Sequence, residues 1–262
     1  MSLLVTEDIA ISFGGVTAVD GVGFTAEPGR VLSIIGPNGA GKTTLFNIVS
    51  GLYVPDRGRV RLAGEDVTAH PPHVLAAKGL SRSFQNLQIF AHMTAVENVM
   101  VGRHLRERCR LLPDLLRLPS VLRQNRETRE RALELLAFVG LAERADAPAG
   151  ALPYGMLKRL EIARALAAEP KVLLLDEPAA GCNPVETEEV VRLIKMMTGR
   201  GVAVVLVEHN MKLVMKISDR ILVLARGRPL AEGPPQAVRQ NPAVIEAYLG
   251  RQGAREMTRA RG

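Results

Sequence analysis

The stretch GPNGAGKTT, from Gly36 to Thr44, constrains the fold more than any other part of the sequence. It follows the apolar run VLSII and precedes a helix-compatible segment, so it predicts a strand, a glycine-rich turn and a helix. It fills the pattern G-x-x-x-x-G-K-[ST], in which backbone N–H groups surround phosphates and a helix N-terminus adds a favourable partial charge. The sequence therefore predicts a nucleotide-binding P-loop; an exposed glycine-rich turn would not need all of these features.

The predicted nucleotide contacts of this loop come from its backbone and from two side chains. We expect Lys42 to place its charge on the β- and γ-phosphates of ATP, and the Thr43 hydroxyl to bind Mg²⁺. The predicted nucleotide-binding residues of the loop are Gly36, Asn38, Gly39, Ala40, Gly41, Lys42, Thr43 and Thr44.

A second motif, KVLLLDEP, places two carboxylates at the end of another apolar strand. We expect Asp176 to hold the Mg²⁺ and Glu177 to orient or deprotonate the attacking water. An acidic pair at a strand end is in most proteins a solvated turn. The P-loop in the same chain favours the catalytic interpretation here.

The order of strand-like and helix-like segments predicts an α/β fold. Turn-separated extended segments fill the first quarter, including a hairpin in PDRGRVRLAGEDV. The period becomes helical between about residues 94 and 141, where Pro113 and Pro119 limit the basic portion to two or three short helices. After residue 170 strands and helices alternate, which predicts a parallel sheet with helices on its faces. Aromatic residues make up only 3% of the chain, so the core is expected to be aliphatic.

Composition argues against several classes of protein. The longest apolar runs, such as VAVVLV, are too short for a membrane helix, and the N-terminus lacks the basic segment of a secretory signal. Cys109 and Cys182 have neither metal-ligand nor redox spacing, and we interpret Cys182 as a small packing residue. The net charge of +7 is concentrated in residues 103–131 and in the C-terminal tail. We interpret both segments as solvated surface, with a basic patch near a membrane as the alternative.

These motifs together resemble the ATP-binding subunits of ABC transporters over nearly the whole chain, roughly residues 3–250. The resemblance rests on GPNGAGKTT, on Gln85 after LSRSF, on LPYGMLKRLEIARAL as the signature, on LLLDEPAAGCNP and on His209 after VVLVE. It implies a single ABC-type P-loop NTPase domain over residues 1–250. A RecA-like parallel-sheet core with an antiparallel β subdomain would occupy 1–90 and 165–250, an inserted helical subdomain about 91–164, and a basic mobile tail 251–262.

The resemblance also assigns roles to further residues. It implies a head-to-tail dimer that binds ATP between the P-loop of one subunit and the signature of the other. Phe13 would stack on the adenine, and His209 would hold the γ-phosphate and align Glu177. Gln85 would contact the Mg²⁺ or the water and report to the membrane subunits, which would dock on the face around Gln85 to Phe90. The alternatives are a core Phe at a strand end, a surface Gln and a solvated His. Asn183, where most of the family has Asp, stands in a loop that would contact the other subunit.

The signature pentapeptide LPYGM departs from the family pattern. In most members its second residue is Ser, whose hydroxyl reaches the γ-phosphate bound by the opposite subunit. Pro153 removes that hydroxyl and its own N–H, and Met156 replaces the usual Gln. Pro153, Tyr154 and Gly155 remain predicted nucleotide-binding residues, because Gly155 admits a phosphate close to the backbone and the following helix directs its positive end there. We therefore expect a heterodimer rather than a homodimer, with this subunit hydrolysing ATP against a partner's Ser-containing signature.

Three features narrow the resemblance to the ATPases of branched-chain amino-acid importers: GLSRSFQNLQIFAHMTAVENV, the long basic insert and the ending NPAVIEAYLG. Related importers of urea or short amides have similar ATPases. The implied partners are two integral-membrane permease subunits, a second ATPase subunit and, indirectly, a periplasmic or extracellular solute-binding protein, but no nucleic acid. This subunit would lie peripherally on the cytoplasmic face of the membrane.

Two other functions remain as alternatives. One is a non-transport ABC ATPase that acts on nucleic acid, although the region between Gln85 and Leu152 shows none of the sustained heptads that such proteins need. The other is a small-molecule kinase on a P-loop fold, which would lack the signature and a switch His, the role that the resemblance gives to His209.

Overall fold

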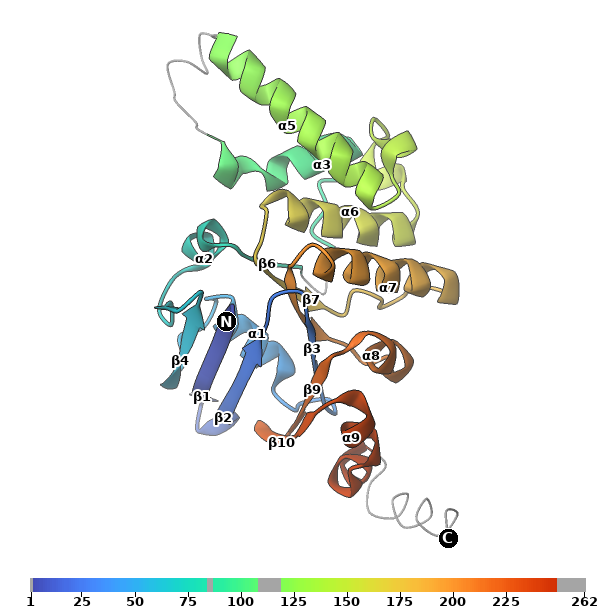
Figure 1. Cartoon of the computed structure of the whole chain (residues 1–262). Coiled ribbons are helices and arrows are strands. Elements are labelled where there is room, and N and C mark those ends of the chain that lie inside the picture. The colour runs from blue at the N-terminus through green and yellow to red at the C-terminus, as the bar shows by residue number, and fades with distance from the viewer. Residues whose placement is uncertain (1, 84–86, 108–118, 249–262) are drawn as a thin grey trace.

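The computed structural model describes residues 2–83, 87–107 and 119–248, and its strands form two sheets (Figure 1). The first is an antiparallel sheet that contains, in spatial order, β2 (Val16–Ala26), β1 (Leu4–Phe13), β4 (Arg57–Leu62) and β5 (Glu65–Asp66). The second contains β10 (Arg228–Gly233), β9 (Arg220–Ala225), β3 (Val31–Ile35), β8 (Ala203–Val207), β7 (Val172–Asp176) and β6 (Leu80–Arg82). The hairpin predicted in PDRGRVRLAGEDV is confirmed as β4 and β5.

The second sheet is parallel except at one edge, where β10 runs antiparallel to β9. Its central strands are buried along their whole length and are aliphatic except for Ser33 and Asp176, in agreement with the low aromatic content. Successive residues of a strand point to opposite faces. In β7, Leu173 and Leu175 therefore pack against helices on one face, and Leu174 packs toward the antiparallel sheet on the other.

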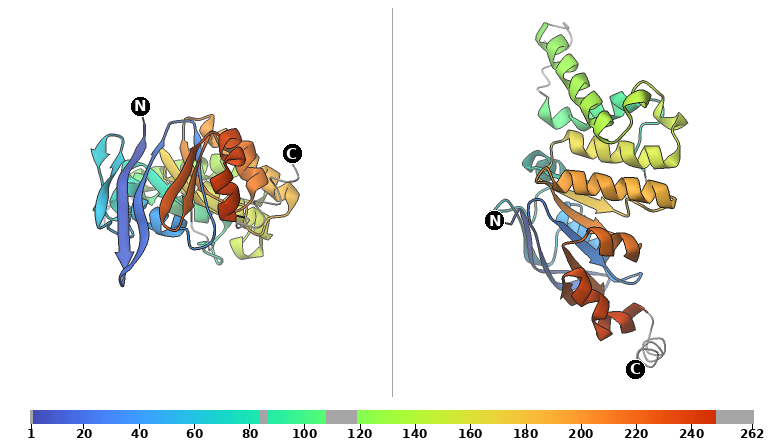
Figure 2. Two further views of the ribbon diagram at one scale, coloured as in Figure 1. Left: turned by 90° about the horizontal axis from the view of Figure 1, so that it is seen from below. Right: turned by 45° about the vertical axis from the view of Figure 1, so that its right-hand side comes forward.

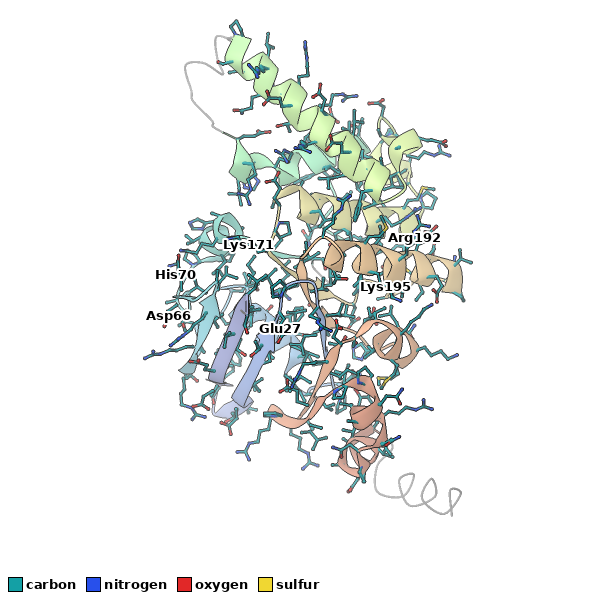
Figure 3. The ribbon with its side chains drawn as sticks, in the orientation of Figure 1. Glu27, Asp66, His70, Lys171, Arg192 and Lys195 are labelled. Atoms are coloured by element: carbon teal, nitrogen blue, oxygen red, sulfur yellow. The ribbon has the colours of Figure 1, made fainter. Side chains whose placement is uncertain are left out.

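Helices cover both faces of the parallel sheet, so the predicted α/β layering is confirmed (Figures 1 and 2). Helix α1 (Lys42–Val49) packs between the two sheets, with Leu45 and Phe46 in their shared core. Helix α7 (Pro184–Thr198) buries Val191 and Ile194 on the opposite side of the parallel sheet, and its exposed Arg192 and Lys195 project outward (Figure 3).

Where the structure describes the chain between β6 and β7, it folds mainly as helices. They are α3 (Ala95–Gly102), α5 (Pro119–Phe138) and α6 (Tyr154–Ala167), with short 3₁₀ turns at His104–Arg106, Ala142–Arg144 and Ala149–Ala151. These helices share one core with α7 and lie at the top of Figure 1. The expectation of only short helices here is wrong for α5, which has 20 residues. Pro119 begins this helix instead of interrupting it, because the first helical position needs no N–H donor; Pro113 lies outside the described residues.

Short helices complete the fold. The sequence patterns predicted α8 (Met211–Ile217) and the helix over residues 242–248, but not α2 (Pro72–Lys78) or α9 (Pro235–Gln240), which are only one to two turns long and each begin with proline. Helices α8, α9 and 242–248 pack on β9 through Val214, Val238 and Val244. No helix in the described part of the chain is long and apolar enough to cross a membrane. The basic tail 251–262 lies outside the described residues.

Candidate nucleotide site

The candidate site forms where three parallel strands end. Strand β8 lies between β3 and β7, so the segments that follow these strands meet at one edge of the sheet. Residues 38–44 after β3, Glu177 after β7 and His209 after β8 line one cleft of about 710 Å³. Val16, Thr17, Ala18, Arg226 and Gly227 form the remaining walls of the cleft. The structure thus brings together most of the residues that the two motifs and the switch His predict.

The first residue of the phosphate loop has to be glycine. Gly36 has φ +155°, and a Cβ atom at this position would fall on the carbonyl oxygen of Leu224 in β9. At the other end of the loop, Lys42 is the first residue of α1 and is 7% exposed. Its Nζ donates to the carbonyl oxygens of Gly36 at 2.7 Å and Pro37 at 3.1 Å. Burial lowers the pKa of Lys42, and the nearby carboxylates Glu177 and Asp176 oppose that shift.

Glu177 and His209 face each other across the cleft. The Glu177 Oε1 atom lies 2.8 Å from His209 Nε2, and the two side chains are 18% and 47% exposed. The Glu177 backbone has φ +50°, a left-handed conformation that costs about 1 to 3 kcal/mol for a residue with a side chain. Its N–H donates to the Val207 carbonyl at 2.9 Å, which holds this strained turn against β8. A carboxylate aligned by an imidazole beside a phosphate loop can accept a proton from water.

Asp176 is buried and forms an ion pair. Its Oδ2 atom lies 3.0 Å from Arg82 Nη2, and the two side chains are 4% and 7% exposed. Burial raises the pKa of Asp176, and the Arg82 guanidinium opposes that shift. Among the described residues no group of three or more His, Cys, Asp or Glu could hold a metal ion. The Thr43 hydroxyl and the Asp176 carboxylate are oxygen donors of the kind that fits Mg²⁺, which is bound by few protein ligands together with phosphates.

Sequence reasoning assigned no role to two charged residues that support this site. Glu208 is 4% exposed, and its carboxylate accepts hydrogen bonds from the N–H groups of Ala179 at 3.0 Å, His209 at 3.0 Å and Asn210 at 3.2 Å. It therefore fastens the loop after β7 to the loop after β8. Arg82 is the second such residue. The charged residue at the end of the apolar run VVLVE is the only signal that the sequence offers for Glu208, and the short segment LSR offers none for Arg82.

Phe13 lies near the cleft but outside its lining. The ring is 47% exposed and makes an edge contact with Tyr53, with centroids 5.3 Å apart. Phe13 pairs across the β1–β2 turn with Val16, which does line the cleft. An exposed ring at this position is not the strand-end core Phe that was its alternative. Gln85 lies outside the described residues.

The signature residues Pro153, Tyr154 and Gly155 are at the start of α6 and do not belong to the described lining of the cleft. Gly155 packs so closely under Glu186 that a Cβ atom would fall on the Glu186 carboxylate. Tyr154 packs beside Gly181 in the loop after β7. Within one chain, the residues predicted to bind nucleotide therefore form two separate groups.

The structure accounts for Asn183 and Cys182, the two unusual residues of the loop between β7 and α7. The Asn183 side chain caps α7 by accepting hydrogen bonds from the N–H groups of Val185 at 2.9 Å and Glu186 at 3.0 Å. Asn and Asp cap helices equally well, so the replacement of Asp keeps this part of the structure. Burial raises the pKa of the Cys182 thiol, which suits a packing residue and not a reactive thiolate.

Comparison with known proteins gives matches over nearly the whole chain. The profile of the family described as "ABC transporter" matches residues 19–180, and that of "Branched-chain amino acid ATP-binding cassette transporter" matches residues 228–254. The high-affinity branched-chain amino acid transport ATP-binding protein BraF of Pseudomonas aeruginosa is 48% identical over 95% of this chain and 98% of its own length. The protein LivG of Escherichia coli, which carries the same description, is 44% identical over the same shares.

A solved structure confirms the fold. The crystal structure of a nucleotide-free ATP-binding cassette from an ABC transporter superposes with a TM-score of 0.83. It is 33% identical in sequence, and the match covers 95% of this chain and 99% of that one.

Proposed function

Because the chain belongs to the ATP-binding subunits of ABC transporters, we propose that it hydrolyses ATP to energise the import of branched-chain amino acids. The pair of Glu177 and His209, 2.8 Å apart and facing the phosphate loop, carries the hydrolytic part of this proposal. The family match over residues 228–254 and the two relatives that transport branched-chain amino acids support the choice of solute. The relatives are transport proteins, so the nucleic-acid alternative finds no support.

In this proposal the residues of the cleft divide the chemistry among them. Backbone N–H groups of residues 38–44 and the Lys42 ammonium hold the phosphates, and Glu177 takes a proton from the attacking water. His209 holds the Glu177 carboxylate in the orientation that this transfer needs. Thr43 and Asp176 would hold Mg²⁺, which supplies positive charge against the phosphates when it is bound.

The separation of the two groups of nucleotide-binding residues supports a dimer. Pro153, Tyr154 and Gly155 lie away from the cleft of their own chain, so they can complete only the cleft of a second subunit. This chain has the residues of a full cleft but a signature without the Ser hydroxyl. We therefore propose a second, different ATPase subunit as its partner, with a Ser-containing signature that completes the site described here.

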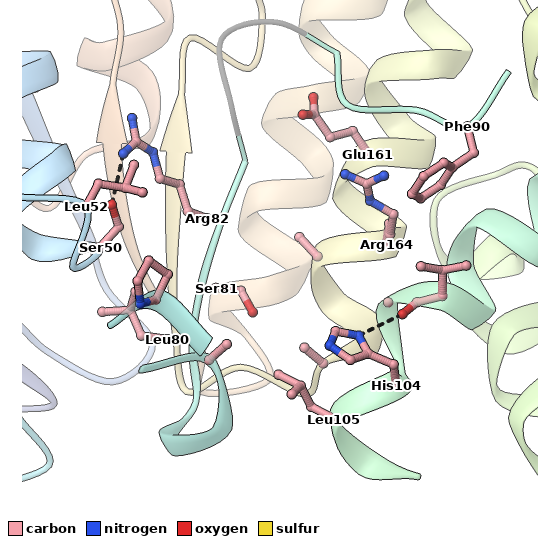
Figure 4. Close-up of a pocket in the computed structure, with 16 residues that line it drawn as sticks. Ser50, Leu52, Leu80, Ser81, Arg82, Phe90, His104, Leu105, Glu161 and Arg164 are labelled. Atoms are coloured by element: carbon pink, nitrogen blue, oxygen red, sulfur yellow. Dashed lines mark hydrogen bonds between the residues drawn. The ribbon is translucent and has the colours of Figure 1, made fainter. Parts of the chain in front are cut away.

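A groove between the parallel sheet and the helices is the proposed docking site for the permeases (Figure 4). It has a volume of about 350 Å³ and is lined by residues of β6, α2, α3 and α6. Phe90, 49% exposed, stands at its wall with Arg164, whose guanidinium lies 5.6 Å from the ring centroid. Permease subunits bound in this groove would hold the ATPase on the cytoplasmic face of the membrane. A periplasmic or extracellular solute-binding protein would act on the ATPase only indirectly, through the permeases.

The substitution Glu177→Gln tests the assignment of the base. We expect the variant to bind ATP as the wild type does, to hydrolyse it at least about a hundredfold more slowly, and to accumulate with its partner ATPase subunit as an ATP-bound dimer in size-exclusion chromatography. The control is Glu188→Gln, which alters an exposed carboxylate on α7 that pairs with Lys216. Hydrolysis by Glu177→Gln at the wild-type rate would refute the assignment.

A further inference from the structure

A buried arginine connects the groove to the nucleotide site. Arg82 ends β6 and Asp176 ends the neighbouring strand β7, which places the guanidinium Nη2 atom 3.0 Å from Asp176 Oδ2. Both side chains are almost fully buried. Moving either partner away would leave an uncompensated charge in the protein interior, so the two groups have to move together.

The same guanidinium also binds the end of helix α1. Its Nη1 atom donates to Asn47 Oδ1 at 2.7 Å and to Ser50 Oγ at 2.9 Å, and it lies 5.6 Å from the centroid of the Phe46 ring. Helix α1 begins at Lys42 in the phosphate loop. One planar group therefore ties the Asp176 carboxylate at the end of β7 to the helix that follows β3.

Arg82 is also part of the groove wall. It lines the groove with its hydrogen-bond partner Ser50 and with Glu161 and Arg164 of α6, as Figure 4 shows. The residue that holds Asp176 is therefore also a neighbour of any segment that enters this groove. The cleft and the groove are separate cavities with different linings, and Arg82 belongs to the lining of the groove while its partner Asp176 directly precedes Glu177 of the cleft.

We propose that Arg82 is a positioning residue that transmits occupation of the groove by a permease segment to the orientation of Asp176. The identity of that segment rests on the proposed function. Arginine is suited to this task because its planar fork holds Asp176 through one nitrogen and the end of α1 through the other. A lysine has a single ammonium on a flexible stem and cannot keep both ends in this arrangement.

The test compares Arg82→Lys with the wild type in two measurements. The first is the dissociation constant of a fluorescent ATP analogue for the isolated subunit, in Mg²⁺ and in EDTA. The second is the stimulation of ATP hydrolysis when the subunit is assembled with its permeases in proteoliposomes. The control is Arg159→Lys, which changes another largely buried arginine. Its side chain is 14% exposed and pairs with Glu189, and Arg159 belongs to the described lining of neither cavity.

We expect Arg82→Lys to bind the analogue normally in EDTA. The factor by which Mg²⁺ lowers the dissociation constant should be about tenfold smaller than in the wild type, because substituting the hydrogen-bond partner of a metal ligand typically weakens metal binding by that much. Stimulation by the permeases should fall by a similar factor, and Arg159→Lys should match the wild type in both measurements. If Mg²⁺ tightens binding to Arg82→Lys as much as to the wild type, and the permeases stimulate the wild type, then the inference is overturned and the proposed function stands. If the permeases do not stimulate the wild type, the proposed function is wrong and the transmission with it.

A second variant covers the case in which Arg82→Lys does not fold. The substitution Asn47→Ala removes a contact at the end of α1 that lies outside the groove lining, and it keeps the ion pair with Asp176. Because the guanidinium is then held less firmly, we expect both the tightening of binding by Mg²⁺ and the stimulation by the permeases to fall, by less than in Arg82→Lys. Wild-type values of both measurements in Asn47→Ala contradict transmission through Arg82.

Discussion

Restoring a hydroxyl to the signature, by Pro153→Ser, should strengthen the site that this subunit offers to its partner. Pro153 is the N-terminal cap of α6, makes no side-chain capping bond, and has φ −56°, which Ser adopts without strain. A hydrogen bond from the new hydroxyl to a phosphate is worth about 1.5 to 3 kcal/mol, or roughly tenfold to a hundredfold in affinity.

The same substitution should leave folding stability nearly unchanged. A Ser cap stabilises a helix by about 1 kcal/mol. Loss of the proline increases the entropy of the unfolded chain and costs about 0.4 to 1 kcal/mol. These two effects oppose each other, so a change in nucleotide affinity would report the new hydroxyl and not a change in folding.

The assay is nucleotide binding to the heterodimer in a Lys42→Ala background, where only the partner's P-loop retains its lysine. Titration with a fluorescent ATP analogue should give tighter binding for Pro153→Ser than for the parent. The matched control is Pro153→Ala, which removes the ring without adding a hydroxyl and should leave the affinity unchanged. Equal affinities for all three proteins would show that the end of α6 and Gly155 suffice, and would refute the argument from the missing hydroxyl.

Three further substitutions test the cleft itself. Lys42→Ala should weaken ATP binding by about a hundredfold in isothermal titration calorimetry, because it removes charge-assisted hydrogen bonds to the phosphates; an affinity within a factor of about two of wild type would be inconsistent with the phosphate role. Phe13→Ala should weaken ATP binding by roughly threefold to tenfold through loss of stacking and leave binding of pyrophosphate unchanged, and equal losses for both ligands would exclude an adenine contact. Gly36→Ala should lower the free energy of unfolding by about 1 to 3 kcal/mol in urea denaturation, because its Cβ would meet the Leu224 carbonyl; wild-type stability would contradict the close approach.

The sequence predicted the layers of the fold and most of the cleft because local patterns encode both. The apolar strands before Gly36 and Asp176 and the glycine-rich turn between strand and helix are local signals, and the structure has each of them. The same patterns misjudged α5, because the effect of Pro119 depends on whether it starts a helix or interrupts one.

The supporting residues of the site could not be found in this way. Arg82 and Asp176 are 94 residues apart in the chain, and Ala179 and Glu208 are 29 apart. These pairs meet only because β6, β7 and β8 are neighbours in the sheet. A single sequence does not encode which strands are neighbours in a form that periodicity or motif spacing can detect.

The central claim is that hydrolysis at this cleft energises the import of branched-chain amino acids. The most direct measurement is uptake of radiolabelled leucine into proteoliposomes that contain the assembled transporter, with ATP on the side of the ATPase subunits. Uptake should require ATP with the wild-type subunit and stop with Glu177→Gln, although that variant still binds ATP. Uptake that continues at the wild-type rate with Glu177→Gln, or that does not depend on ATP, would contradict the claim.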